Sequence, residues 1–284
     1  MNNTKSEQLN SIATFRELHE WGCFVLPNPW DAGTAVYLEH LGFKALATTS
    51  AGAAFSKGLP DSVCAIPRDL MLAHFREIVS ATALPVNADF QNGYADAPEG
   101  VAENVKLCVA TGVAGLSIED STGDEVAPLY EFDLAVDRIK AARAAIDASG
   151  IPVVLTGRCE AWLVDAPDPC HVAIERLSAY SEAGADCLYA PGVRDSNEIA
   201  AIVKAVAPKP VNVLVSRPGD GLSVSHLTDL GVRRISVGSA LAAVAWSAFI
   251  RAAHNLATDN SFDGLADAAS YSELNDLFVA RNKE

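Results

Sequence analysis

Short apolar runs recur along the chain, and longer stretches with helical periodicity separate them. Eight such runs, many of them β-branched, cover residues 23–26, 45–48, 85–88, 115–118, 153–156, 187–189, 211–214 and 234–237. Continuous apolar runs are typical of strands that are buried on both faces, as they are in a parallel sheet. The pattern therefore predicts eight strands that alternate with helices.

Glycines and prolines stand where this alternation needs them. Four glycines close a helical stretch shortly before a strand, as helix C-caps do: Gly42, Gly112, Gly184 and Gly231. Three prolines open predicted strands, where a missing N–H costs little: Pro85, Pro152 and Pro210. Eight βα units in 284 residues favour a closed (β/α)₈ barrel. An open, doubly wound sheet is the alternative, but no GxGxxG motif follows the first strand.

Residues 240–284 follow the last predicted strand, and we interpret them as a helical C-terminal extension. Helices are expected over residues 239–257 and 262–279, with a polar segment between them. No linker divides the chain, so residues 1–284 are expected to form one domain. Apolar side chains of the extension need burial, which a neighbouring subunit of a homodimer or homotetramer would provide: Leu256, Phe262, Leu265, Tyr271, Leu274, Leu277 and Phe278.

Composition limits the possible binding partners of the protein and its cellular compartment. The net charge of −15 argues against a nucleic acid, because a phosphate backbone needs a basic face. No apolar run is long enough to span a membrane, and the first ten residues lack the apolar core of a signal peptide. Six cysteines are scattered without a CxxC pair, which disfavours zinc and disulfides. A cytoplasmic protein with reduced thiols is expected.

Polar side chains gather just after the predicted strands, where (β/α)₈ enzymes carry their active sites. Asp89 and Glu119 follow the third and fourth strands, and Arg158 follows the fifth. Carboxylates are the ligands that Mg²⁺ prefers, and Mn²⁺ accepts them too. A guanidinium can hold a substrate carboxylate with two parallel hydrogen bonds. The sequence predicts a site for a metal ion and a small carboxylate.

The small-residue turn Ser50-Ala51-Gly52 follows the second strand and offers backbone N–H groups to an oxyanion. Metal and N–H donors together would stabilise an enolate, the intermediate of reactions that break a bond β to a carbonyl.

Each of these residues also has an ordinary structural interpretation. Asp31 and Asp61 suit helix N-caps or turns, and Asp89, Glu119 and Arg158 could form an inert cluster of ion pairs. Five histidines fall in predicted helices and are expected at the surface: His19, His40, His74, His171 and His254.

Several segments, in this order, carry a specific resemblance. They read NPWDAGTAVYLEHLGFKALATTSAGAAFSKGLPD, PVNADFQNGYAD, GLSIEDST, TGRCEAWL, EAGADCLYAPG, PVNVL and GVRRISVGSAL. From about residue 27 to residue 241 the chain resembles the isocitrate lyase / phosphoenolpyruvate mutase superfamily. The similarity is to its 2-methylisocitrate lyase-like and oxaloacetate decarboxylase-like branch. The resemblance implies a (β/α)₈ barrel whose eighth helix is exchanged between subunits.

The resemblance also implies roles for individual residues. Ser50, Ala51 and Gly52 match the turn that holds the substrate's oxo group and carboxylate. Asp89 and Glu119 match metal-site acids, Asp61 matches an outer acid of that site, and Arg158 matches the carboxylate-binding arginine. Asn212 matches a polar group on the substrate side, and Trp30 an aromatic residue lining the site. On this basis Arg158, Glu119 and Asp61 are the expected catalytic residues.

Two departures from the family pattern bear on the reaction. Asn87 stands where the family's Asp-x-Asp signature has its first acid, so this metal ligand would be a neutral carbonyl oxygen. The cleaving lyases carry a Lys-x-Cys-Gly-His loop after the fourth strand, but residues 121–128 contain no cysteine, lysine or histidine. Cys159 alternates with Arg158 and Glu160, so it should face away from the barrel mouth.

These observations leave four functions open. The first is a decarboxylase or hydrolase-type lyase acting on a short 2-oxo acid such as oxaloacetate or phosphonopyruvate. The second is a carbon–carbon lyase of the methylisocitrate type with another proton donor. The third is a phosphonomutase, and the fourth is a non-catalytic carboxylate-binding homologue.

Overall fold

The computed structural model describes residues 5–219 and 221–281 and contains the predicted barrel. Within the described residues, eight parallel strands lie in the order β1-β8-β7-β6-β5-β4-β3-β2. They are β1 (Phe24–Leu26), β2 (Leu46–Ala47), β3 (Val86–Asp89), β4 (Gly115–Glu119), β5 (Val154–Arg158), β6 (Cys187–Tyr189), β7 (Val211–Leu214) and β8 (Arg234–Ser236). The (β/α)₈ prediction is confirmed. The outermost ends of the predicted domain and extension, residues 1–4 and 282–284, lie outside the described residues.

The barrel closes between its first two strands through side chain and backbone contacts. Ala47 of β2 donates its N–H to the carbonyl of Pro27 at 3.0 Å. The buried Asn28 donates from its amide to the carbonyl of Thr48, and its Oδ1 accepts the N–H groups of Val237 and Gly238. One side chain therefore joins the carboxyl ends of β1, β2 and β8 at the barrel mouth.

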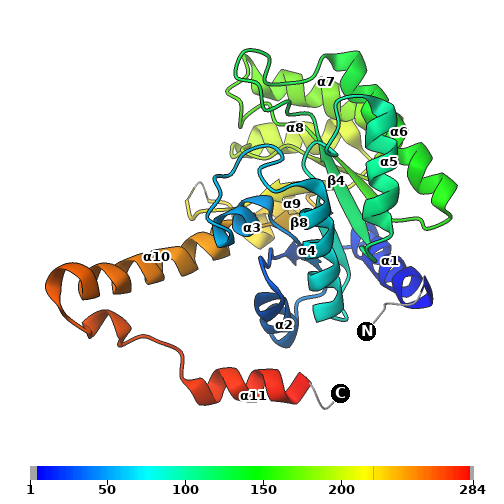
Figure 1. The fold of residues 1–284 in the computed structure, drawn as a ribbon. Helices are drawn as coiled ribbons and strands as arrows, with labels where there is room; N and C mark the ends of the chain where they lie inside the picture. Colours follow the sequence, from blue (N-terminus) through cyan, green and yellow to red (C-terminus); the bar gives the residue numbers. More distant parts are fainter. Residues whose placement is uncertain (1–4, 220, 282–284) are drawn as a thin grey trace.

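Helices surround the strands, as the alternating pattern predicted (Figure 1). They are α1 (Lys5–Glu20), α2 (Ala32–His40), α3 (Ser50–Ser56), α4 (Arg68–Ala81), α5 (Pro98–Val109), α6 (Phe132–Ser149), α7 (Pro169–Glu182), α8 (Ser196–Val206) and α9 (Val224–Asp229). The four predicted capping glycines all adopt a positive φ, between +82° at Gly42 and +104° at Gly184, which side chains with a Cβ rarely tolerate.

The C-terminal extension differs in part from the prediction. Helix α10 (Ala240–His254) projects from the barrel and continues into one π-helical turn, Asn255–Asp259 (Figure 1). The second predicted helix, over 262–279, is wrong in its first half. Residues Asp263–Leu265 form a 3₁₀ turn, and α11 begins only at Tyr271 and runs to Arg281. Large apolar side chains of the extension are exposed in the single chain, among them Phe249, Ile250, Phe262 and Tyr271.

Helix α1 packs beside the start of β4 and fills the closed end of the barrel (Figure 1). Phe15 is fully buried there, so close to Gly115 that a Cβ on that glycine would lie 2.8 Å from the Phe15 ring. Phe15→Ala is expected to lower the free energy of unfolding by about 3–5 kcal/mol, because a large cavity would remain. Urea unfolding measures this loss.

Trp21, just after α1 and 81% exposed, is the matched control for that substitution. Trp21→Ala should change the free energy of unfolding by less than about 0.5 kcal/mol. Equal losses for the two variants would contradict the view that Phe15 seals the barrel.

Two histidines correct the expectation that helix histidines lie at the surface. His74 is buried in α4, and His19 is half-buried at the closed end of the barrel. His40, His171 and His254 are exposed as predicted. Across residues 5–219 and 221–281, no helix is both long and apolar enough to cross a lipid bilayer.

Candidate active site

A cavity of about 60 Å³ opens inside the barrel at the carboxyl ends of the strands, where sequence analysis placed the site. All eight described strands contribute to its wall, which is mostly polar. Its lining residues are Leu26, Asn28, Ala47, Thr48, Thr49, Asn87, Asp89, Ser117, Arg158, Tyr189, Asn212, Arg234, Ser236 and Gly238. The structure thus brings together four of the predicted site residues, namely Asn87, Asp89, Arg158 and Asn212.

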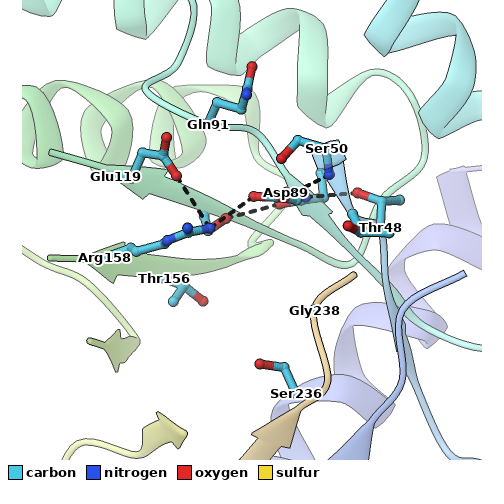
Figure 2. A network of polar contacts seen from close by, with 12 residues as sticks. Thr48, Ser50, Asp89, Gln91, Glu119, Thr156, Arg158, Ser236 and Gly238 are labelled. Atoms are coloured by element: carbon cyan, nitrogen blue, oxygen red, sulfur yellow. Dashed lines mark hydrogen bonds and ion pairs between the residues drawn. The ribbon is translucent and has the colours of Figure 1, made fainter. Parts of the chain in front are cut away.

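Asp89 ends β3 and lies at the centre of the polar network (Figure 2). Its backbone N–H donates to Thr48 Oγ1 at 2.9 Å. One carboxylate oxygen accepts the N–H of Ser50 at 2.9 Å, and the other lies 3.3 Å from Nη1 of Arg158. The two contacts of the carboxylate, one from the end of β2 and one from the end of β5, hold it in one orientation, and the Thr48 hydroxyl holds its backbone.

Ser50, Ala51 and Gly52 are not a separate turn but the first turn of α3, which corrects the sequence prediction. Thr49 caps this helix, and its Oγ1 accepts the N–H of Gly52 at 3.2 Å. The N–H of Ser50 is taken by Asp89. The positive end of the α3 dipole therefore faces Asp89 and the cavity mouth, which favours negative charge there.

Arg158 is surrounded by carboxylates (Figure 2). Glu160 binds it through Nε and also through Nη2, at 3.2 Å for the second contact. Nη1 lies 3.3 Å from Asp89 and 3.3 Å from Glu119. Glu160 thus occupies the Nε edge of the guanidinium, and the opposite edge faces the acids of β3 and β4.

The carboxylates outnumber the cations around the cavity mouth. Burial raises the pKa of Glu119, and the neighbouring acids Glu160 and Asp89 add to this effect while Arg158 opposes it. Partial desolvation also raises the pKa of Asp61, which is exposed, with Asp89 adding to the effect and Arg158 opposing it. Asp61 therefore lies within electrostatic range of both residues, and its role as an outer acid of the site stays a prediction. Asp89, Glu119 and Glu160 all contact the one guanidinium of Arg158, so acids outnumber cations here.

Asp120 does not point into the cavity, although it follows Glu119 directly. Its carboxylate accepts hydrogen bonds from Tyr180 and Arg176 of α7, at 2.7 and 3.2 Å. The other oxygen accepts the N–H of Glu160 at 2.8 Å. Asp120 therefore fixes the backbone of Glu160, and Glu160 in turn binds Arg158. Asp120 is a positioning residue.

Three other residues that the sequence analysis named lie apart from the carboxylate cluster. Trp30 does not line this cavity but a neighbouring apolar one of about 270 Å³, with Trp246 and Phe249 of α10. Asp31 forms the N-cap of α2 in a capping box with Thr34, which is its ordinary structural role. Asn212 is buried in β7 and its amide donates to Ser236 at 2.9 Å.

The donor set suits a hard divalent cation. Asp89 and Glu119 offer carboxylate oxygens beside the same Nη1 of Arg158. Asn87 Oδ1 is a buried acceptor without a hydrogen-bond partner among the described residues, but it lies beside Gly115, next to the Phe15 ring at the closed end of the barrel. Its role as a metal ligand stays a prediction. Across the same residues, no three acids, histidines or cysteines converge as a ready metal-binding cluster. This is compatible with Mg²⁺, which keeps several of its waters and takes few protein ligands.

Residues 121–128 form a short exposed loop closed by a bridge between Ser121 and Leu129. Asp124 Oδ1 accepts the N–H of Val126, whose side chain is 93% exposed. The loop carries two acids and no thiol. Cys159 is fully buried and belongs to the apolar core, so it faces away from the cavity as predicted. Burial raises its pKa well above the ordinary value, which keeps the thiol inert.

Comparison with known proteins identifies the family. Residues 15–257 match the family model described as phosphoenolpyruvate phosphomutase. The chain belongs to this family. Its homologues are lyases, decarboxylases and phosphomutases of the isocitrate lyase/phosphoenolpyruvate mutase superfamily, and this chain is an enzyme of the same superfamily.

Three proteins of known sequence or structure are similar to this chain. A crystal structure from Burkholderia cenocepacia, described as a candidate lyase/mutase, is 48% identical with a TM-score of 0.91, over 96% of this chain and 97% of that one. Oxaloacetate decarboxylase of Rhodopseudomonas palustris is 34% identical over 68% of this chain and 67% of that protein. A structure of oxaloacetate acetylhydrolase with its product oxalate is 26% identical with a TM-score of 0.85, over 97% and 96% of the two chains.

The sequence prediction missed several residues of the cavity wall, among them Tyr189, Arg234 and Ser236. Arg234 could have been predicted from the sequence. A charged side chain within an apolar barrel strand points either outward toward the helices or into the barrel, and the second case indicates a polar site. Tyr189 and Ser236 give no such indication, since both residue types are common in ordinary strands.

Proposed function

We propose that this chain is a Mg²⁺-dependent lyase that cleaves a small 2-oxo acid through an enolate-like intermediate, with decarboxylation of oxaloacetate as the leading candidate. The observation that supports it is the group of acids around Arg158 at the mouth of a small polar cavity. The acids suit a metal ion, and the guanidinium suits the carboxylate of a substrate. Mn²⁺ is expected to replace Mg²⁺.

Asp89 and Glu119 would hold the ion directly or through its waters, with Asp61 in an outer position. When bound, the ion would polarise the oxo group of the substrate and stabilise the negative charge that develops there. The protein's own residues bind, orient and desolvate the substrate around it.

Arg158 would bind the substrate carboxylate on the edge that Glu160 leaves open. Glu160 holds the other edge of the guanidinium, and Asp120 holds the backbone of Glu160. This chain of contacts keeps the guanidinium in one plane, so that little orientation entropy is lost on binding. The positive end of α3 lies on the opposite side of the same substrate, next to Asp89.

Cleavage of the bond between C3 and C4 of oxaloacetate would release CO₂ and leave the pyruvate enolate. Solvent would then return a proton to C3, since this step needs no dedicated thiol. Trp30 lines an apolar cavity together with Trp246 and Phe249 of α10. It would shield the site from solvent once another copy of the chain covers α10.

A direct test is turnover of oxaloacetate, phosphonopyruvate and 2-methylisocitrate by purified full-length protein with and without Mg²⁺. We expect oxaloacetate decarboxylation that EDTA abolishes and Mg²⁺ or Mn²⁺ restores. Turnover of phosphonopyruvate alone would favour phosphonate chemistry. Absence of any turnover, together with Mg²⁺-dependent binding of oxalate, would favour a non-catalytic carboxylate-binding protein.

Cleavage of 2-methylisocitrate is expected to be slower than in the thiol-bearing lyases by roughly 10²–10⁴-fold, the usual contribution of a positioned general acid. The reason is the exposed loop of residues 121–128, which carries no proton-donating thiol. Steady-state kinetics with the purified substrate measures it. Turnover on the order of 10 per second would be ordinary enzyme catalysis and would contradict this expectation.

We also propose a cytoplasmic homodimer or homotetramer built through residues 240–284, attached to one barrel domain. Exposed apolar side chains on α10, including Val244, Phe249 and Ile250, support an interface between copies of the chain. Light scattering should show at least a dimer. A chain ending at Ala257 should dissociate or lose melting temperature, whereas a monomeric full-length protein would contradict the proposal.

A further inference from the structure

Arg234 is a cation at the floor of the cavity that the proposed chemistry does not use. It lies in β8 and is 2% exposed. It lines the same cavity as Asp89 and Arg158, but its contacts come from deeper strand positions and from α1. The cavity thus has one guanidinium at its mouth and a second one below.

The contacts of Arg234 are all with neutral groups. Nε donates to Asn212 Oδ1 at 2.9 Å, Nη2 donates to Thr156 Oγ1 at 3.1 Å, and Nη1 lies 3.4 Å from Nε2 of His19. Burial and the neighbouring Arg234 lower the pKa of His19 to about 3, so the imidazole is neutral. Among the described residues, Arg234 has no carboxylate within ion-pair distance. Its buried charge is therefore solvated by dipoles but not neutralised.

Arg234 also fixes the direction of the hydrogen bonds around it. A guanidinium has donors only, so Asn212 must turn its Oδ1 toward Arg234. The amide nitrogen of Asn212 then faces Ser236 and donates to Oγ at 2.9 Å. That nitrogen keeps a second hydrogen. Ser236 accepts this one bond and makes a side-chain hydrogen bond with Tyr189, which also lines the cavity. Arg234 and Asn212 consequently present donors, and no acceptor of Asn212, at the cavity floor, with the hydroxyls of Ser236 and Tyr189 beside them.

We infer that Arg234, Asn212 and Ser236 form a second anion subsite, and that the substrate is a short dianion with one charged end at the mouth and the other on this floor. The inference rests on the proposed function of the same site and narrows its substrate class. A second carboxylate or a phosphonate at the floor would supply the counter-charge that Arg234 lacks. A substrate with a neutral or apolar far end would leave a buried cation without one, which is costly.

The test compares ligands that differ only at one end. Succinate and its half-amide succinamate have the same length, but the amide carries one charge fewer and adds donors that face the donors of the floor. Calorimetric titration of the Mg²⁺-loaded, full-length protein should show succinate binding at least ~10-fold tighter, equivalent to about 1.4 kcal/mol. Arg234→Met should reduce this preference to less than ~3-fold, while binding of the shorter dianion oxalate at the mouth should change by less than ~3-fold.

Thr156→Val is the matched control, because it removes another contact of Arg234 that does not line the cavity. It should keep the preference for succinate. If Arg234→Met fails to fold, Ser236→Ala decides, since it removes one floor hydroxyl and should weaken the preference at least ~3-fold.

An unchanged preference in folded Arg234→Met, or an equal loss in Thr156→Val, would overturn the subsite. Failure of the proposed function has a different signature. In that case the succinate preference would persist while no 2-oxo acid is turned over. The two ideas can therefore fail separately.

Discussion

Replacing Asp89 with alanine is expected to reduce kcat for the proposed reaction by about 10²–10³-fold and to abolish the Mg²⁺ dependence of the remaining rate. The carboxylate accepts the N–H of Ser50 and contacts Nη1 of Arg158, so its removal affects both of these groups as well as the proposed metal ligand. Rate measurements over a Mg²⁺ series report both effects.

Asp89→Asn separates the charge of this residue from its hydrogen bonds. The amide oxygen can still accept the N–H of Ser50, but it offers no negative charge to a cation. We expect Asp89→Asn to retain the melting temperature and to lose Mg²⁺ affinity by a factor similar to that of the alanine variant. Glu125→Gln, at an exposed acid of the loop after β4, makes the same charge change and should leave kcat within ~2-fold.

The two variants together distinguish a metal site from an inert ion cluster. If Asp89, Glu119 and Arg158 only stabilise the fold, both variants lose melting temperature and neither changes the Mg²⁺ dependence. A kcat that stays within ~3-fold of wild type in folded Asp89→Asn would contradict the assignment of this residue.

The sequence was sufficient to predict the barrel, because its strands are short apolar runs between helical stretches. The observed strands lie within one or two residues of the predicted ones; β5, for example, begins at Val154 and extends to Arg158. The positions just past the strand ends were also predictable, because parallel strands all place their carboxyl ends at the same face. Asp89, Glu119 and Arg158 meet there for this reason.

The direction of side chains beyond the strand ends could not be predicted in the same way. Asp120 follows a strand with the same polarity as Glu119, yet the donors of α7 turn it outward. Trp30 lies in a loop, where no strand alternation constrains it, and it faces α10 instead of the main cavity. The Ser50 turn became a helix start because Thr49, which the sequence prediction did not consider, caps it.

The C-terminal extension is the largest difference between prediction and structure. Its helical pattern was read as continuous from residue 262, but Asp263–Leu265 forms a 3₁₀ turn and a non-helical stretch follows before α11. The spacing of apolar residues in this segment depends on the surfaces against which it packs as well as on its local conformation, so the spacing alone did not indicate a helix correctly. Helix α11 contacts α2 of its own chain, where Phe278 lies against Gly33. The exposed side chains of α10 would then be covered by another copy of the chain.

Arg158→Lys is expected to reduce kcat/KM for the proposed reaction nearly as much as Arg158→Ala, by about 10²-fold or more. The reason is geometric. Glu160 occupies the Nε edge of the guanidinium, and only the planar group can bind Glu160 and a substrate carboxylate on two different edges at the same time. An ammonium group would satisfy Glu160, Asp89 and Glu119 as a point charge and would have no fixed second edge for the substrate.

Oxalate titration provides a measurement that does not depend on turnover. Binding should weaken by at least ~10-fold in both Arg158 variants, and Glu160→Gln should weaken it less, because that change loosens the guanidinium without removing it. The effects of Asp89→Asn and Arg158→Lys should not add in the double variant, since both residues act on one substrate and contact each other. Independent, additive losses, or an Arg158→Lys variant that keeps wild-type oxalate affinity, would show that Arg158 balances the charge of the surrounding acids and does not bind the substrate.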